Sequence, residues 1–217
     1  MTDRSGKQCL WILLIVSLVL TVLVATGTTL APMSFDNLAQ RATAIAHLRC
    51  VSVQSGWLDG EIWTTSQFVV LEEIKPDVYG GAEVAIAPAG PAYSNVPQNA
   101  QSSAPRISVR QLGGNIGGVR SHVDEVPEFQ PGEELYLFLW RRPNEPYRVL
   151  GWTQGTFRVT RDARTGAAHV TQDSAIAAFH ANTRDFQHSG VQNLPLAAFQ
   201  EKLRQSLAAT QSSQLSD

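Results

Sequence analysis

A histidine and a carboxylate stand two residues apart in the stretch VRSHVDEVPEF, the arrangement with the clearest potential for acid–base chemistry. Alternate residues of an extended strand point to the same side, so His122 and Asp124 would face the same way. A histidine beside a carboxylate can serve as a general base, which makes a hydrolase with a dispersed site one hypothesis. We favour the alternative that both are hydrophilic residues at an exposed sheet edge.

Four glycines surround Asn115 and Ile116 in the stretch QLGGNIGGVR, and their spacing distinguishes a phosphate-binding loop from a turn. A dinucleotide fingerprint needs glycines at i, i+2 and i+5, between a strand and a helix. Position i+2 from Gly113 is Asn115, no helical stripe follows, and no lysine is near enough for a phosphate loop. Glycine pairs between strands are typical of turns, bulges and close backbone approaches, so a turn is predicted.

The remaining histidines and acidic residues match no known metal motif. The five histidines include no His-Glu-x-x-His pair and no two at i, i+4. Five carboxylates between Asp124 and Glu134 cluster locally, but Pro127 and Pro131 interrupt them and calcium-loop spacing is absent. No serine has the Gly-x-Ser-x-Gly surroundings of an esterase nucleophile. We therefore predict a non-catalytic protein without a cofactor or metal.

Tryptophans are the main candidates for a binding surface. Trp57, Trp63, Trp140 and Trp152 are expected on strands, where packing in the core or at its rim is commoner than sugar stacking. Of these, Trp57, Trp63 and Trp152 form our candidate contact surface for a protein or cell-envelope partner.

The charge balance argues against a nucleic-acid partner. The 217 residues carry a formal net charge of -2, and 15 basic and 18 acidic residues remain once the first 30 residues are set aside. Nucleic-acid binding needs a basic surface that releases counterions from phosphates. Arg141, Arg142 and Arg148 are expected at solvated strand ends, with an anion site as the alternative. The 43% hydrophobic content indicates a globular domain.

An uncharged segment near the N-terminus predicts export. Residues 9–33 carry no charge and follow Arg4 and Lys7, so the positive-inside rule leaves the N-terminus in the cytoplasm. The span is long enough to cross a bilayer, whereas the apolar part at 10–24, followed by small residues at 25–27, also suits a cleaved signal peptide. We favour an uncleaved anchor and a cell-membrane protein with its C-terminal domain outside the cytoplasm. Cleavage would make the protein periplasmic or secreted.

The two cysteines, Cys9 and Cys50, fall on either side of this segment. A membrane would separate them, so they are not expected to pair within one chain. Cys50 is predicted to be free and buried, with a link to another molecule as the alternative.

Hydrophobic periodicity predicts the elements that position these side chains. Ser34 is a good N-cap for a short amphipathic helix near 35–46. The period then changes to two, and Asp59-Gly60 predicts a tight hairpin turn before a strand near 61–74. Further strands are expected in four stretches: RISVRQL, EELYLFLW (buried on both faces), YRVLGW and GTFRVTRD.

The last part of the chain predicts one more strand and a helix. Thr165-Gly166 should turn the chain back through AAHVTQD, and Pro195 starts a helix whose apolar stripe runs from Leu196 to Leu207. Short strands without intervening helices indicate an antiparallel sheet. The predicted fold is mainly β, a small OB-like antiparallel barrel flanked by the two helices, with a sandwich as the alternative.

Three segments follow from this organisation. Residues 1–33 form the signal anchor or signal peptide, 34–172 the β-barrel domain, and 173–217 a C-terminal helix with a polar tail. Residues 88–105 hold four prolines and no charge, which predicts a flexible insertion in the β domain.

The order of these motifs resembles a group of exported bacterial single-domain β proteins of unknown function. The matching parts are Asn37-Leu38 and Arg41-Ala42, GEIWTTSQFVVLEEIKPD, the pairs Gly113-Gly114 and Gly117-Gly118, FQPGEELYLFLW, and YRVLGWTQGTFRV. The resemblance covers about 35–161 and implies a fold more than a chemistry. The group usually closes the second strand with Lys-Gly, where this chain has Lys75-Pro76.

The predicted barrel is also distantly similar to the OB-like N-terminal domain of tissue metalloprotease inhibitors. That similarity implies a module that binds an exported protease. The inhibitors depend on disulfides that this chain lacks, so the hypothesis ranks below a membrane-anchored domain that binds a protein or envelope component.

Overall fold

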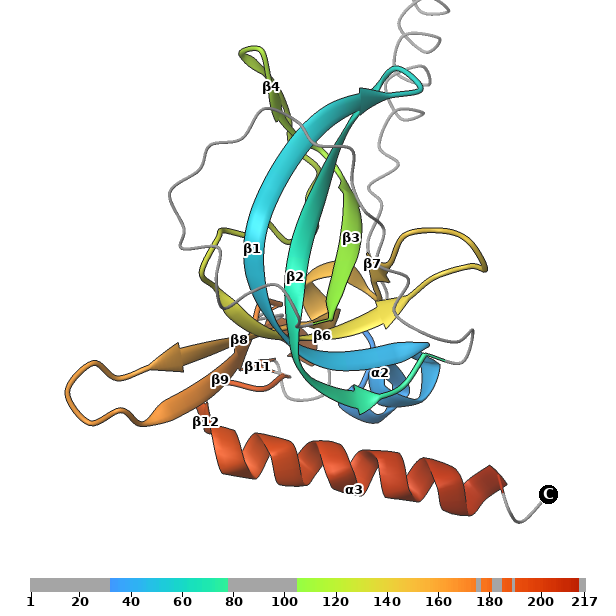
Figure 1. The fold of residues 1–217 in the computed structure, drawn as a ribbon. Helices are drawn as coiled ribbons and strands as arrows, with labels where there is room; N and C mark the ends of the chain where they lie inside the picture. Colours follow the sequence, from blue (N-terminus) through green and yellow to red (C-terminus); the bar gives the residue numbers. More distant parts are fainter. Residues whose placement is uncertain (1–31, 78–104, 175–176, 181–184, 189, 215–217) are drawn as a thin grey trace, which may run out of the picture. The chain divides into compact units, whose positions relative to one another are not determined.

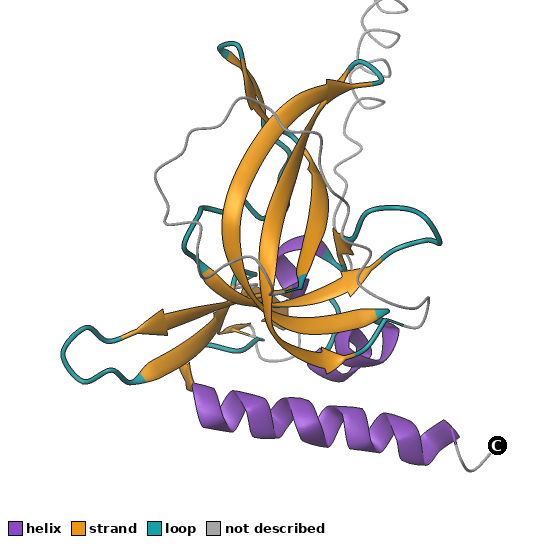
Figure 2. Cartoon of the chain, in the orientation of Figure 1, coloured by secondary structure: helices purple, strands orange, loops and turns teal. Residues whose placement is uncertain are grey.

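The computed structural model describes residues 32–77, 105–174, 177–180, 185–188 and 190–214 (Figures 1 and 2). The described residues from Pro32 onward belong to one compact unit. The predicted membrane segment, apart from Pro32 and Met33, lies outside the described residues, and so does the predicted insertion apart from Pro105. Among the described helices, none is long and apolar enough to cross a membrane.

An antiparallel sheet dominates the described residues. Its path runs through β12 (Leu194–Pro195), β9 (Ala168–Gln172), β8 (Thr156–Arg161), β6 (Glu134–Trp140), β1 (Ala44–Leu58), β2 (Glu61–Lys75) and β3 (Arg106–Leu112), while β7 (Arg148–Val149) pairs with β6. The mainly β, antiparallel prediction is thereby confirmed. The predicted closed barrel is not found in the part of the chain that is described, because the path ends at β12 and at β3.

The longest feature of the sheet is the hairpin of β1 and β2, which pair along their whole lengths. Asp59 and Gly60 form its turn with φ values of 51° and 81°, the positive angles that the Asp-Gly sequence predicts. A bulge between Cys50 and Ser52 shifts the register part-way along β1. On its other side, β1 pairs with β6 only from Ala44 to Arg49.

Strand β6 lies at the centre of two hydrophobic cores, as its apolar run predicts. Leu135, Leu137 and Leu139 belong to an inner core with side chains of β1, β2 and β3. Tyr136 and Phe138 belong to a helix-side core on the opposite face, with side chains of the two helices. We call β6, the parts of the sheet that pair with it and these two cores the base of the sheet.

The first helix, α2 (Phe35–Arg41), is shorter than predicted. Ser34 caps its start by accepting a hydrogen bond from the Asn37 backbone, but the predicted end near residue 46 is wrong. Ile45 and Ala46 lie in β1, because helical and strand spacing both fit this short apolar run and pairing with β6 decides between them. The Lys75 ammonium closes α2 by donating to the carbonyls of Ala39, Gln40 and Ala42 at 2.7–3.0 Å.

The C-terminal helix, α3 (Leu196–Gln214), packs its predicted stripe into the helix-side core, where Phe199 and Leu203 are fully buried. Cys50 is buried and free, as predicted. Burial and the nearby Glu133 carboxylate raise the pKa of this thiol to about 11.

One local prediction differs from the structure, and one element was not predicted. Trp152 was predicted to lie on a strand, but it begins a 3-10 turn, η1 (Trp152–Gly155). Gly151 and Trp152 both have positive φ, and this bends the chain away from a strand conformation. A small hairpin of β10 (Ala177–His180) and β11 (Asp185–His188) was not predicted.

Candidate binding site

The predicted glycine turn is a hairpin that continues directly from β3. Strands β4 (Gly114–Ile116) and β5 (Val119–Ser121) pair through a turn at Gly117 and Gly118, whose φ values are 59° and 83°. The Gly113 backbone N–H donates to the carbonyl of Ile62 at 2.7 Å, which fixes the point where the chain leaves the sheet. The prediction of a turn is therefore confirmed.

Gly114 lets this hairpin lie against the inner face of β1 and β2. A Cβ atom at Gly114, whose φ is 139°, would overlap the hydroxyl oxygens of Ser55 and Thr64. The Asn115 backbone N–H donates to Ser55 Oγ at 3.3 Å. The hairpin is thus positioned by a close approach that only glycine permits.

A cavity of about 310 Å³ lies between this hairpin and the sheet. Its walls come from the inner faces of β1, β2 and β3, from the β4–β5 hairpin, and from the segment 121–129. Val53, Leu112, Val123, Val126 and Phe129 supply apolar surface, whereas Ser55, Thr64 and Gln111 supply polar groups. We call it the mouth cavity, and we call the β1–β2 tip, the β4–β5 hairpin and segment 121–129 together the mouth.

The hydroxyls that line the mouth cavity are already bonded to one another. Thr64 Oγ1 donates to the Gly113 carbonyl at 2.7 Å and therefore accepts from Ser55 Oγ, 2.9 Å away. Ser55 in turn accepts the Asn115 N–H. These groups hold the hairpin in place. Among the described residues, no histidine or carboxylate is hydrogen-bonded to either hydroxyl, as a nucleophile would require.

Gln111 is the exception in this lining. It pairs directly with Thr64 across β2 and β3, is only 7% exposed, and its side-chain Nε2 has no hydrogen-bond partner among the described residues. Ser66, two residues along the same face of β2, is also buried, and its Oγ has no partner there. Each such buried polar group costs about 1–3 kcal/mol when unsatisfied. Of the two, Gln111 lines the mouth cavity, and its unpartnered amide indicates a place for a polar ligand or water.

The predicted His122–Asp124 pair lies at the rim of the mouth cavity. Its nitrogen and oxygen are 3.4 Å apart, and the other ring nitrogen lies 3.7 Å from a Glu128 oxygen. Arg120 lies 3.6 Å from the same Glu128 carboxylate. All four side chains are mostly exposed, so water screens these charges. The interpretation as hydrophilic edge residues fits this geometry better than an acid–base centre.

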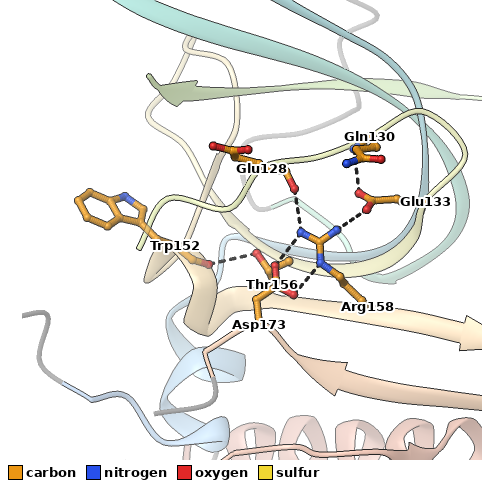
Figure 3. A network of polar contacts seen from close by, with 7 residues as sticks. All are labelled: Glu128, Gln130, Glu133, Trp152, Thr156, Arg158 and Asp173. Carbon is orange, nitrogen blue, oxygen red and sulfur yellow. Dashed lines mark hydrogen bonds and ion pairs between the residues drawn. The ribbon is translucent and has the colours of Figure 1, made fainter. Parts of the chain in front are cut away.

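An arginine on β8 holds segment 121–133 against the sheet (Figure 3). Arg158 Nε and Nη2 donate to both carboxylate oxygens of Asp173, at 2.7 and 2.8 Å, and Nη2 also donates to the Glu128 carbonyl at 2.8 Å. Its third nitrogen lies 2.6 Å from Glu133, whose other oxygen accepts the Gln130 N–H at 2.8 Å. Bidentate geometry of this kind fixes both distance and orientation.

These contacts connect the base to the mouth. Burial would lower the pKa of Arg158, but hydrogen bonds and charge from Asp173 and Glu133 outweigh it and raise the pKa. The guanidinium therefore stays charged and keeps the wall of the mouth cavity at Glu128 and Phe129 in position.

The three tryptophans of the predicted contact surface occupy three different settings. Trp57 is 57% exposed at the β1–β2 tip, where it pairs with Ile62. Trp63 pairs with Gly56, one position away, and so lies on the opposite face of the hairpin. Trp152 is 38% exposed and begins η1. The structure does not bring these three side chains onto one face.

The three arginines considered for an anion site each contact different residues. Arg141 donates to Asp77 at 2.5 Å, and Arg142 lies 3.7 Å from Glu145. Arg148 stacks on the rings of Trp63 and Trp140 at 5.2 and 5.8 Å. Each is engaged by its own neighbours, so a shared anion site is not formed.

No group of three or more His, Cys, Asp or Glu side chains among the described residues could hold a metal ion. Comparisons of the chain with protein-family models, with curated proteins and with solved structures give no match. The mouth cavity is therefore a candidate binding site on the basis of its geometry alone. The missing hydrogen-bond partner of Gln111 depends on the fold and has no signal in the sequence.

Proposed function

We propose that the protein is an exported, membrane-anchored, non-catalytic β domain that binds a protein or cell-envelope partner at the mouth. The observation that carries this proposal is Gln111, a buried amide donor without a partner among the described residues, at the wall of the mouth cavity. A stable fold gains nothing from such a group, whereas a ligand with an oxygen acceptor would satisfy it.

Exposed apolar side chains around the mouth support the same conclusion. Trp57 and Leu58 stand at the β1–β2 tip, and Val119, 51% exposed, stands beside the β4–β5 turn. Aromatic and aliphatic side chains at the rim of a pocket with a few polar groups are typical of recognition surfaces. The hydroxyl groups in the cavity are engaged in holding the hairpin, which favours binding over catalysis.

We further propose that β3 closes an OB-like barrel through β7. A parallel bridge joins Val109 to Tyr147, and the Arg110 N–H donates to the Tyr147 carbonyl at 2.8 Å. This contact would complete a circuit of β1, β2, β3, β7 and β6. Slow hydrogen exchange at Arg110 would support closure, and exchange as fast as at the β1–β2 tip would contradict it.

Site-specific photo-crosslinking in cells that express the full chain tests binding at the mouth. A photoreactive residue at Trp57 or Val119 should give a discrete crosslinked species. The matched position is Leu71 on β2, which is 40% exposed but lies away from the mouth cavity. Gln111→Leu should remove the mouth crosslinks. Equal crosslinking from Leu71, or crosslinks indifferent to Gln111→Leu, would contradict the proposal.

The predicted anchor needs its own test. The full chain should stay with membranes through alkaline extraction, and protease added from outside the cytoplasm should cleave the domain. Release at alkaline pH would favour a cleaved signal peptide, and protection from protease would contradict export.

A further inference from the structure

Beyond Cys50, one backbone edge of β1 has no partner strand within the described ranges. On that side the last hydrogen bonds join Cys50 N–H to the Glu133 carbonyl at 2.9 Å and Gly132 N–H to the Cys50 carbonyl at 2.8 Å. β2 covers only the opposite edge, up to Leu58. Figure 1 shows β1 on the side of the β1–β2 hairpin away from β3. We call residues 52–58 of β1 the open edge.

The sequence of the open edge, SVQSGWL, lacks the devices that normally protect a free strand. Proteins usually blunt such edges with lysine, proline or inward-pointing charge. The open edge has neither charge nor proline, and Val53, Trp57 and Leu58 are exposed on it. Pairing with β6 ends at Arg49, and no strand within the described ranges pairs with the backbone of residues 52–58 on that side. Uncharged, unpaired backbone of this kind is suited to accept another strand.

The open edge is also a wall of the mouth cavity. Val53 and Ser55 point to the inner face of the hairpin and line the cavity together with Gln111. Alternate side chains of a strand added beside them would point to the same face. One of those side chains would then reach a cavity of about 310 Å³ that has an unsatisfied amide donor in its wall.

We propose that an extended segment of a partner protein adds to the open edge as an antiparallel strand and places an uncharged side chain with an oxygen acceptor in the mouth cavity. This inference rests on the proposed binding function and specifies its partner. Backbone hydrogen bonds give the affinity, and the acceptor at Gln111 gives the specificity.

A second copy of this chain fits the open edge less well. In a self-paired edge, the inward-facing side chains would again be Val53, Ser55 and Trp57. Ser55 is already engaged with Thr64 and Asn115, and the amide of Gln54 lies on the opposite face. A second copy therefore brings no free amide oxygen to Gln111.

The probe is a blocked heptapeptide, Thr-Val-Thr-Asn-Thr-Val-Thr, titrated to millimolar concentration into the full ¹⁵N-labelled chain in detergent micelles. Its matched control carries the same side chains but is N-methylated at the alternate residues whose N–H groups would face β1, which removes the backbone donors on that edge of the peptide. We expect amide shifts at 52–58 and at the Gln111 side chain, with affinity reduced at least about tenfold by N-methylation.

Each other outcome overturns a defined part of the inference. If the methylated peptide shifts the Gln111 amide equally well and leaves 52–58 unchanged, the mouth cavity binds side chains and strand addition is wrong. If neither peptide causes shifts, both the inference and the proposed function fail. Exchange protection on the open edge before peptide is added, or concentration-dependent dimerisation through it, would show that this chain itself occupies the edge and would contradict a partner strand.

Discussion

The base and the mouth of the same sheet differ in how far their apolar side chains are buried and their polar groups are paired. In the base, β6 is buried on both faces, and His47 stacks on Tyr136 with ring centroids 4.3 Å apart. The Glu134 carboxylate there is contacted by both His47 and Arg161. In the mouth, the tip of the β1–β2 hairpin exposes Trp57. Gln111 on β3 lines the mouth cavity, and its side-chain amide has no partner among the described residues. The base thus pairs its carboxylate internally, whereas the mouth cavity has in its wall an amide donor without a partner among the described residues.

Removing a side chain from the base should lower the free energy of unfolding far more than removing one from the mouth, and this is the largest difference expected between the two regions. Phe138, fully buried between Phe35 and Phe157, is part of the base, and Phe138→Ala should lower the free energy of unfolding by about 3–5 kcal/mol. Trp57→Ala at the exposed tip should change it by less than about 0.5 kcal/mol. Chemical denaturation of both variants measures the difference. Equal losses would show that the mouth is as structural as the base.

Breaking the link between base and mouth should have the next largest effect. Arg158→Met leaves Asp173 and Glu133 without their cation and should cost about 2–3 kcal/mol. It should also speed hydrogen exchange in segment 121–133 more than in β6. Arg142→Met, which removes an exposed pair with Glu145, is the control and should be nearly neutral. Uniform exchange changes would argue against a specific link.

Uncapping α2 should affect the base moderately. Lys75→Met removes the ammonium that donates to three carbonyls at the end of the helix and should lower the free energy of unfolding by about 1–2 kcal/mol. Lys202→Met removes only a cation stacked on Phe35 and should cost less. The midpoints of chemical denaturation of the two variants measure the difference. If Lys75→Met left the free energy of unfolding unchanged, water would be shown to replace the ammonium at the end of α2.

The smallest effect concerns pH. Burial lowers the pKa of His47 below its ordinary value of 6.5 although Glu134 opposes this. For Glu134, burial would raise the pKa, but Arg161 and His47 outweigh it and lower it. Both shifts mean that the folded state binds fewer protons, so stability is present above the ordinary pKa values and is lost on acidification.

His47→Gln should therefore flatten the fall in stability just below pH 6.5, while the part at lower pH that comes from the effect of Arg161 on Glu134 should remain. Denaturation at a series of pH values measures this. An unaltered profile in His47→Gln would contradict the assignment.

Sequence reasoning succeeded where one local pattern decides the structure. Asp59-Gly60 and Gly117-Gly118 each require positive φ angles, and the continuous apolar run of β6 predicts its burial on both faces. It failed at Ile45, where pairing with β6 overrides helical spacing. The mouth cavity could not be foreseen, because Gly114, Ser55 and Thr64 meet only after the hairpin lies over the sheet.

The central claim is that Gln111 is retained for a ligand at a cost to the free protein. Gln111→Leu has similar volume and removes the unsatisfied amide, so the account predicts that it raises the free energy of unfolding of the unliganded protein by about 1 kcal/mol. Gln67→Leu is the control, because Gln67 donates to Ser108 at 2.7 Å and its loss should not stabilise. A Gln111→Leu protein less stable than wild type would contradict the claim.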